Sequence, residues 1–340
     1  MNAKFTIFVP VHNGGGHLKR CVESVFAQTL QDFDLVVLEN GSTDGTREWL
    51  ANVRDPRLKV LPSERCLPIE ENWGRVLAQP KNEFMTIFGH DDLMDPNYLA
   101  VMDAAVRRHP DASLYFAHFR YVDEAGQELH ACRPLPERET AAEYLQGLYT
   151  RQRDTYGTGY LYRSARYEAV GGMPRWRHLV FADDALWLKL MEGSWKATAP
   201  ERCFAIRVHK GRYGERARWR DWAEGLAPYI AFLQAAAHRD PSLEKALAAH
   251  GPGYFLEWCN SLYESALVEA SKRNQRLDPA DVSMLKEAIQ IVAPGKWPQY
   301  HGNPRFRFRR RRELLNQFRL PRWLYYRYRR LRYRSELPAG

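Results

Sequence analysis

Short apolar segments alternate with amphipathic segments along the first hundred residues. Runs rich in β-branched residues predict strands, and apolar residues spaced three or four positions apart predict helices. The strand segments are residues 5–12, 33–38, 57–61 and 83–89, and the helical segments are residues 17–28 and 69–78. Strands that alternate with helices predict an α/β fold with a doubly wound, mostly parallel sheet flanked by helices.

Polar turns follow three of these strands. They are Pro10 to Asn13, Glu39 to Asp44, and the acidic pair Asp91-Asp92. Because ligands of open α/β sheets bind outside the carboxyl ends of the strands, we expect the three turns to converge on one crevice.

The acidic pair Asp91-Asp92 ends an apolar run and precedes a predicted helix. Two adjacent carboxylates repel one another, so the pair is tolerated where water solvates it or a divalent cation neutralises it. The same residues also suit a cluster that caps the following helix. The pair alone does not decide between a metal site and a cap.

Several motifs together carry a resemblance to a known family. They are Val9-Pro-Val-His-Asn13, Leu38-Glu-Asn-Gly-Ser-Thr-Asp44, Asn72-Trp-Gly74, His90-Asp-Asp92, Tyr167-Glu-Ala-Val-Gly-Gly-Met-Pro174 and Ala182-Asp-Asp-Ala-Leu-Trp-Leu-Lys189. In order and spacing, residues 4–210 resemble the inverting, bacterial-type family 2 glycosyltransferases with the GT-A fold. The resemblance implies transfer of a sugar from a nucleotide diphosphate donor, usually a UDP sugar, to an acceptor.

The resemblance also implies a donor site. Pro10, His12 and Asn13 correspond to residues that meet the base and the ribose, and Glu39 stands where the family usually has an Asp that binds uracil. Asp44 lies in the following turn. Asn72 and Arg75 correspond to residues on the helix that lines the nucleotide pocket.

The metal assignment rests on the same resemblance. Asp91 and Asp92 match the acidic motif in which one carboxylate contacts the ribose and the other holds Mg²⁺ or Mn²⁺ against the diphosphate. His209 corresponds to a residue that approaches the metal or the diphosphate, with a structural role as the alternative. Gly89 stands where many family members have a further Asp, so the motif is one carboxylate short.

Asp183 matches the general base of these enzymes, and Asp184 competes for the same role. An inverting transfer needs a base on the acceptor hydroxyl. A carboxylate at a helix start gains from the helix dipole, so we expect a lowered pKa for Asp183. The alternative is a plain helix cap.

Charge is concentrated at the C-terminus. Residues 305–340 contain thirteen arginines and two glutamates, a net charge of +11, against +9 for the whole chain. Aromatic residues are interleaved with the arginines of residues 305–334, which suits an anionic membrane surface. Packing on the catalytic domain and nucleic-acid binding are the alternatives, the latter the weakest.

Three regions are predicted. Residues 1–215 form the GT-A domain, with a nucleotide-binding half (1–100) and an acceptor half (101–215). Residues 216–300 form a helical region that is a candidate dimerisation element, with helices at 219–238, 241–250, 254–273 and 279–292. Residues 301–340 form the basic aromatic tail.

Composition is consistent with an enzyme that works in the cytoplasm, peripheral to the inner face of the cell membrane. Five scattered cysteines indicate reduced thiols, no window reaches the length of an apolar membrane span, and the N-terminus resembles no signal peptide. We therefore expect a metal-dependent transferase that acts on a glycan or lipid-linked acceptor in cell-surface polysaccharide synthesis. The alternatives are a sugar nucleotidyltransferase and a non-catalytic relative that binds nucleotide sugars.

Overall fold

One mixed sheet carries the candidate site. The computed structural model describes residues 3–154, 156–209, 218–272 and 277–292. Within them the strand order is β3-β2-β1-β4-β9-β6-β10-β5, with β7 paired to β6 and β8 paired to β10. The strands are β1 (Phe5–Val11), β2 (Phe33–Glu39), β3 (Leu58–Leu61), β4 (Phe84–Ile87), β5 (Leu93–Met94), β6 (Leu114–Val122), β7 (Glu128–Ala131), β8 (Arg138–Glu139), β9 (Leu161–Arg163) and β10 (Lys196–Arg207).

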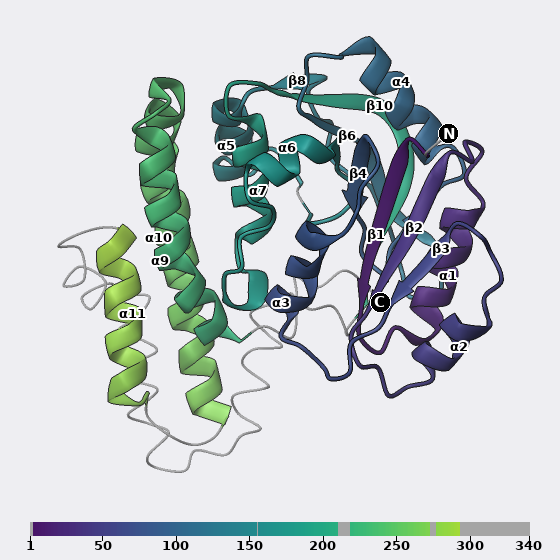
Figure 1. The fold of residues 1–340 in the computed structure, drawn as a ribbon. Helices are drawn as coiled ribbons and strands as arrows, with labels where there is room; N and C mark the ends of the chain where they lie inside the picture. The colour runs from purple at the N-terminus through teal and green to yellow at the C-terminus, as the bar shows by residue number, and fades with distance from the viewer. Residues whose placement is uncertain (1–2, 155, 210–217, 273–276, 293–340) are drawn as a thin grey trace. The chain divides into compact units, whose positions relative to one another are not determined.

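Helices connect and flank these strands. They are α1 (Gly15–Phe26), α2 (Thr46–Asn52), α3 (Ile69–Gly74), α4 (Tyr98–Arg108), α5 (Ala141–Tyr149), α6 (Ser164–Ala169), α7 (Ala182–Met191), α9 (Trp219–Ala237), α10 (Pro241–Lys272) and α11 (Pro279–Val292), with short 3-10 turns η1 (Arg75–Ala78) and η2 (Arg177–Leu179). Figure 1 shows α1 and α2 on one side of strands β1 to β3 and α3 on the other.

The N-terminal half of the sheet is parallel, as the alternation of elements predicts. Strand β1 pairs in parallel with β2 and β4, and β2 pairs in parallel with β3. All seven residues of β1 are buried, because neighbouring strands and helices cover both faces of this central strand. The carboxyl ends of β1, β2 and β4 therefore lie at one edge of the sheet.

The second half of the sheet is mixed. Strand β9 runs antiparallel to β4 and to β6, whereas β10 runs parallel to β6 and antiparallel to β5. Strand β5 directly follows the acidic turn, and its pairing brings the end of β10 to that turn. The sheet thus places residues 91–92 beside residues that are more than a hundred positions later in the chain.

The predicted break at Gly251-Pro252-Gly253 is wrong, because α10 is one helix that runs through Pro252. Proline fixes φ near the helical value and removes one hydrogen bond, so it interrupts the ladder locally without ending the helix. The predicted starts at Pro241 and Pro279 are confirmed, in agreement with the preference of proline for a first helical turn.

The chain forms two compact units, of which the first ends at Tyr254 and the second begins at Phe255. Helix α9 belongs to the first unit, and the predicted boundary at residue 215 stays a prediction. The basic aromatic tail at 301–340 and its predicted membrane role lie outside the described residues. Along the described part of the chain, no helix combines the length and apolar character that crossing a membrane requires.

Candidate functional site

The turns after β1 and β2 are joined by direct hydrogen bonds. The ring of His12 lies with Nδ1 2.9 Å from the carbonyl oxygen of Asn40. Asn13 has a positive φ of 54°; its backbone N–H donates to Ser42 Oγ at 2.9 Å and its Oδ1 accepts from Thr43 N at 2.8 Å. The expected convergence of these two turns is therefore confirmed.

Glu39 is fully buried and its carboxylate already has partners. One oxygen accepts from Ser42 N at 2.5 Å, and the other accepts from Arg47 Nε at 2.9 Å and Nη2 at 2.7 Å. Burial acts to raise the pKa of Glu39, but the hydrogen bonds from Ser42 and Arg47 outweigh it and lower the pKa. The ionised Glu39 side chain thus stabilises the turn that follows β2. The predicted contact of Glu39 with the nucleotide base stays a prediction.

Asn72 and Arg75 tie the ends of β2 and β3 to α3. Arg75 donates from Nη1 to Glu39 O at 3.2 Å and to Asn72 Oδ1 at 3.0 Å, and from Nη2 to Leu61 O at 2.6 Å. Asn72 is buried. Asn72 lies in α3 and Arg75 begins the 3-10 turn η1 that follows it, and their contact with a nucleotide stays a prediction.

Asp44 organises the start of α2. Its Oδ1 accepts from Thr46 N at 3.1 Å, and Thr46 Oγ1 accepts from the N–H groups of Gly14 and Gly15 at 3.1 and 3.2 Å. The hydrogen bonds with Thr46 lower the pKa of Asp44, although burial opposes them. The turn after β1 and the start of α2 are therefore fixed to one another.

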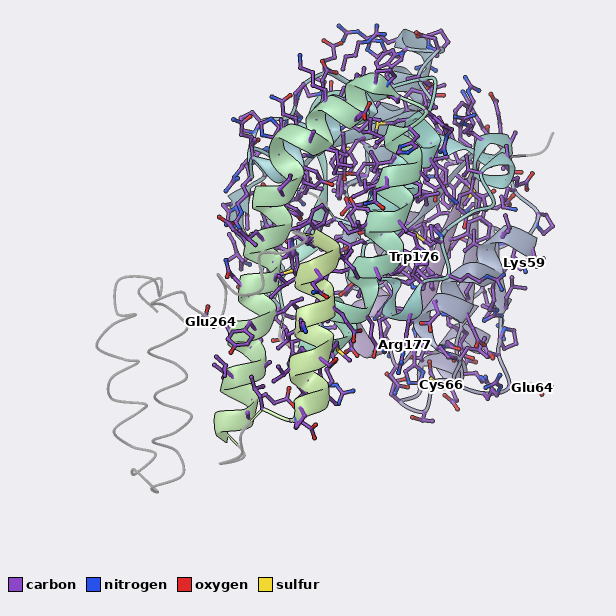
Figure 2. The ribbon with its side chains drawn as sticks, turned by 90° about the vertical axis from the view of Figure 1, so that its left-hand side faces the viewer. Lys59, Glu64, Cys66, Trp176, Arg177 and Glu264 are labelled. Atoms are coloured by element: carbon purple, nitrogen blue, oxygen red, sulfur yellow. The ribbon has the colours of Figure 1, made fainter. Side chains whose placement is uncertain are left out.

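Cys66 lies in the loop that follows β3, near Glu64 (Figure 2). It is exposed, and the other four cysteines are buried and free of disulfides, as the sequence predicts. Its Sγ lies 3.8 Å from His12 Nε2. The loop is held to β2 because Asn40 exchanges hydrogen bonds with the backbone of Leu67.

The acidic turn is held by the end of β10. Asp92 is buried, and its Oδ1 accepts from the backbone N–H of Arg207 at 3.0 Å. The guanidinium of Arg207, itself fully buried, donates to the carbonyl oxygens of Asp91, Asp123 and Glu124 at 2.9, 3.1 and 2.9 Å. The sequence patterns do not single out Arg207, because nothing local predicts a buried arginine at the end of a strand.

Asp91 pairs with His209, and the predicted approach of His209 to a metal or diphosphate stays a prediction. Asp91 Oδ2 lies 3.0 Å from His209 Nε2, and the ring of His209 stacks on that of His17 with centroids 4.7 Å apart. Burial acts to raise the pKa of Asp91, but the neighbouring His90 ring and the hydrogen bond with His209 lower it. The carboxylate is therefore ionised and faces imidazole groups.

Gly89 explains why the acidic motif is one carboxylate short. A Cβ atom at position 89 would lie 2.7 Å from Asp92 Oδ2 and 3.0 Å from Asp91 Oδ1. Real Cβ atoms essentially never approach another atom as closely as 2.7 Å, so a side chain here displaces the Asp92 carboxylate and crowds that of Asp91. The two remaining carboxylates occupy the space that a third would need.

We expect Gly89→Ala to weaken metal-dependent nucleotide binding about tenfold, because the new methyl group pushes the Asp92 carboxylate away from Arg207 N. Isothermal titration calorimetry with UDP and Mn²⁺ measures the change. Gly16→Ala is the matched control, since a Cβ at position 16 meets no atom within 4 Å. Equal affinities for the two variants would contradict the steric explanation.

The donor set fits a hard divalent cation only in part. Within the described residues no three His, Cys, Asp or Glu side chains gather as a complete metal site. Mg²⁺ and Mn²⁺ commonly take one or two protein ligands and fill the remaining positions with phosphate oxygens and water. Asp91 and His209, whose side chains lie 3.0 Å apart, are the residues that would hold such a cation.

Asp183 and Asp184 begin α7 in different environments. Asp184 is buried, and its Oδ1 accepts from Tyr144 OH at 2.9 Å; burial, and then the charge of Asp183, raise its pKa to about 7. Asp183 is partly exposed, and its Oδ1 accepts from Asp184 N at 3.0 Å. The expected lowering of the Asp183 pKa is wrong, because burial raises it despite the helix start.

The loop at Gly157-Thr158-Gly159 lies between the acidic turn and Asp183. Thr158 Oγ1 accepts from Gly89 N at 2.9 Å. A Cβ at Gly157 would lie 3.1 Å from Asp183 Oδ2, so the backbone passes close to that carboxylate. The sequence reasoning missed this loop, although two glycines around a threonine are a signal of close backbone approach.

The segment before α7 is strained. His178, Leu179 and Phe181 have φ values of 60°, 55° and 58°, which cost roughly 1 kcal/mol or more each for residues with a Cβ. Phe181 stacks on Tyr229 of α9 at 4.7 Å, and a Cβ at Gly225 would lie 2.4 Å from Val180. Packing against α9 offsets the strain and fixes where α7 begins.

A family model covers much of this site. Residues 6–168 match the model for Glycosyl transferase family 2. The glycosyltransferase GlyG of Streptococcus pneumoniae serotype 4 is 27% identical over 127 residues, which are 37% of this chain and 42% of GlyG. An uncharacterized glycosyltransferase of Rickettsia felis is 25% identical over 133 residues, 38% of this chain and 22% of that protein. The matches thus span less than half the length of these relatives.

The fold has solved counterparts. The S. aureus TarS fragment 1–349, crystallised in complex with UDP-GlcNAc, superposes with a TM-score of 0.59 at 17% sequence identity. The match covers 87% of this chain and 92% of the TarS fragment. The predicted fold class is confirmed, with the sheet mixed in its second half.

Proposed function

Because the chain belongs to glycosyltransferase family 2, we propose that it transfers a sugar from a nucleoside diphosphate donor to an acceptor hydroxyl with inversion. The observation that carries this proposal is the link from the acidic turn to Asp183. Thr158 bonds to Gly89 at the acidic turn, and its neighbour Gly157 lies against Asp183. An inverting transfer needs the sugar donor at one end of this link, at the acidic turn, and a general base at the other end, at Asp183.

In this proposal Asp91 and His209 hold Mg²⁺ or Mn²⁺, and Asp92 keeps the turn in place through Arg207. The cation supplies Lewis-acid stabilisation of the charge that develops on the departing nucleoside diphosphate. His12, Asn13, Asn72 and Asp44 surround the joined turns where the base and ribose would lie. Pro10 is buried near the end of β1, directly before these residues, and we propose that it lies under the nucleotide.

We assign the base to Asp183, with Asp184 as its support. Asp184 is buried and accepts a hydrogen bond from Tyr144, whereas Asp183 is partly exposed beside the backbone of Gly157. Burial raises the pKa of Asp183, which makes it a stronger base than an ordinary carboxylate. Its partial exposure lets an acceptor hydroxyl reach it.

We propose a UDP sugar as the donor. UDP-GlcNAc is the first candidate to examine, because TarS, which shares this fold, has been crystallised with it. We further propose a glycan or lipid-linked acceptor of cell-surface polysaccharide synthesis, reached from the cytoplasmic face of the membrane. Hydrolysis measured over a panel of nucleotide sugars identifies the donor without requiring the acceptor.

We expect UDP to bind in the presence of Mn²⁺, and Asp91→Asn to weaken that binding at least tenfold, because the amide oxygen carries no charge to hold the cation. Asp92→Asn should weaken it as well, through the loss of the charged acceptor for Arg207 N. Calorimetry with and without Mn²⁺ measures both changes, and Asp95→Asn is the control outside the turn. Absence of UDP binding to the unaltered chain with Mn²⁺ would overturn the proposed function.

A further inference from the structure

We propose that Tyr144 is a positioning residue for the acidic pair Asp183-Asp184, a role that rests on the proposed function of Asp183. Tyr144 lies on α5, is fully buried, and donates its hydroxyl hydrogen to Asp184 Oδ1 at 2.9 Å. Asp184 N in turn donates to Asp183 Oδ1 at 3.0 Å. Two hydrogen bonds therefore connect the Tyr144 hydroxyl, through residue 184, to the carboxylate of Asp183.

Buried charges hold the Tyr144 ring in place. The guanidinium of Arg153 lies 4.1 Å from the ring centroid, and the Lys196 ammonium lies 5.7 Å from it. Both cations pair with the buried carboxylate of Glu139 at 2.5 Å. Cations over an aromatic face attract it, and a buried ion triad resists displacement because separating its members leaves uncompensated charge.

Chain connectivity strengthens this arrangement. Glu139 directly precedes Thr140, which begins α5 in a capping box with Glu143: Glu143 N donates to Thr140 Oγ1 at 3.3 Å, and Thr140 N donates to Glu143 Oε2 at 2.8 Å. The cap fixes the first turn of α5, and Tyr144 follows one residue later. The capped helix α5 fixes the backbone of Tyr144, and the neighbouring cations fix its ring. Together they fix the position of the tyrosine hydroxyl.

The start of α7 needs such support. It follows Phe181, whose positive φ is strained, and it carries two adjacent carboxylates that repel one another. The Tyr144 hydroxyl stabilises the ionised form of Asp184, with the charge of Arg153 also nearby. Among the described residues, the other titratable groups that act on Asp184 are Asp183, Tyr149 of α5 and Tyr229 of α9.

The test is the titration of Asp184 in the Tyr144→Phe variant. The carboxyl ¹³C chemical shifts of aspartate-labelled full-length protein report this titration. Loss of the donor removes a stabilising contact from the ionised form, so the apparent pKa of Asp184 should rise from about 7. Asp184→Asn assigns the signal. Tyr115→Phe is the matched control, because Tyr115 is also buried and its hydroxyl donates to the carbonyl oxygens of His109 and Ala112.

An Asp184 titration that is the same in the unaltered chain and in Tyr144→Phe would overturn the positioning role. Thermal unfolding of both phenylalanine variants checks that each is folded; if Tyr144→Phe does not fold, Tyr144→Leu, which also lacks a hydroxyl donor, takes its place. For UDP-GlcNAc hydrolysis we expect Tyr144→Phe to lower kcat about tenfold at unchanged KM, with Tyr115→Phe unaffected. Failure of UDP to bind would count against the proposed function alone, because the titration needs no nucleotide.

Discussion

Asp183→Asn is expected to lower sugar transfer at least a hundredfold while leaving the affinity for UDP and Mn²⁺ unchanged. An amide cannot take the proton of the acceptor hydroxyl, and a positioned general base typically contributes a factor of 10² to 10⁴. Asp183 lies beside Gly157, and the hydrogen bond given for its carboxylate within the described residues is with Asp184 N, so we expect donor binding not to depend on it. Transfer rates and calorimetry on the same preparations measure the two effects.

Asp184→Asn is the comparison for this prediction. Its side chain is buried against Tyr144, so we expect a smaller loss of kcat accompanied by reduced stability. Transfer that survives Asp183→Asn but not Asp184→Asn would move the base by one residue. Because burial raises the pKa of Asp183, kcat should increase with pH through a range above that of an ordinary aspartate, as the proton leaves the base.

Arg207→Met is expected to cost about 3 kcal/mol of unfolding free energy and to abolish Mn²⁺-dependent UDP binding. The substitution keeps most of the volume but leaves three carbonyl oxygens, those of Asp91, Asp123 and Glu124, without the donors they have now. Unsatisfied buried acceptors cost roughly 1–3 kcal/mol each where no water reaches them. Urea denaturation and calorimetry measure the two losses.

Arg202→Met on the same strand is the matched control. Arg202 is exposed and pairs with Glu128 at 3.0 Å, and an exposed ion pair is worth about 1 kcal/mol or less. We therefore expect little change in stability and none in nucleotide binding. Equal effects of the two substitutions would show that the Arg207 side chain does not hold the acidic turn.

Periodicity predicted the N-terminal half of the fold well. The alternation of β-branched runs with amphipathic segments gave β1 to β4 and α1 to within one or two residues. The helix predicted at 69–78 is α3 followed by the 3-10 turn η1, and no bounds were predicted for α2. Parallel pairing placed Asn13, Ser42 and the acidic pair at one edge of the sheet. These features depend on local spacing and on the short connections of α/β units, which are written in the sequence itself.

The detailed roles of charged residues required the tertiary structure. The sequence suggests that the Glu39 carboxylate is available to accept a hydrogen bond from a ligand. In the structure it already accepts hydrogen bonds from Arg47 and Ser42. The helix dipole suggests a lowered pKa for Asp183, yet burial raises it. For Glu39 the hydrogen bonds made in the folded turn, and for Asp183 the burial of the side chain, outweigh what the local sequence suggests.

By itself, the sequence determined that an acidic turn ends a parallel strand and that two aspartates begin a later helix. The tertiary structure alone decided that β5 brings Arg207 to the first site, that Thr158 connects it to the second, and that Tyr144 holds Asp184. Periodicity and turn chemistry report on neighbours within a few positions. Contacts between residues forty to a hundred and sixteen positions apart depend on how strands pair and side chains pack, which local patterns do not encode.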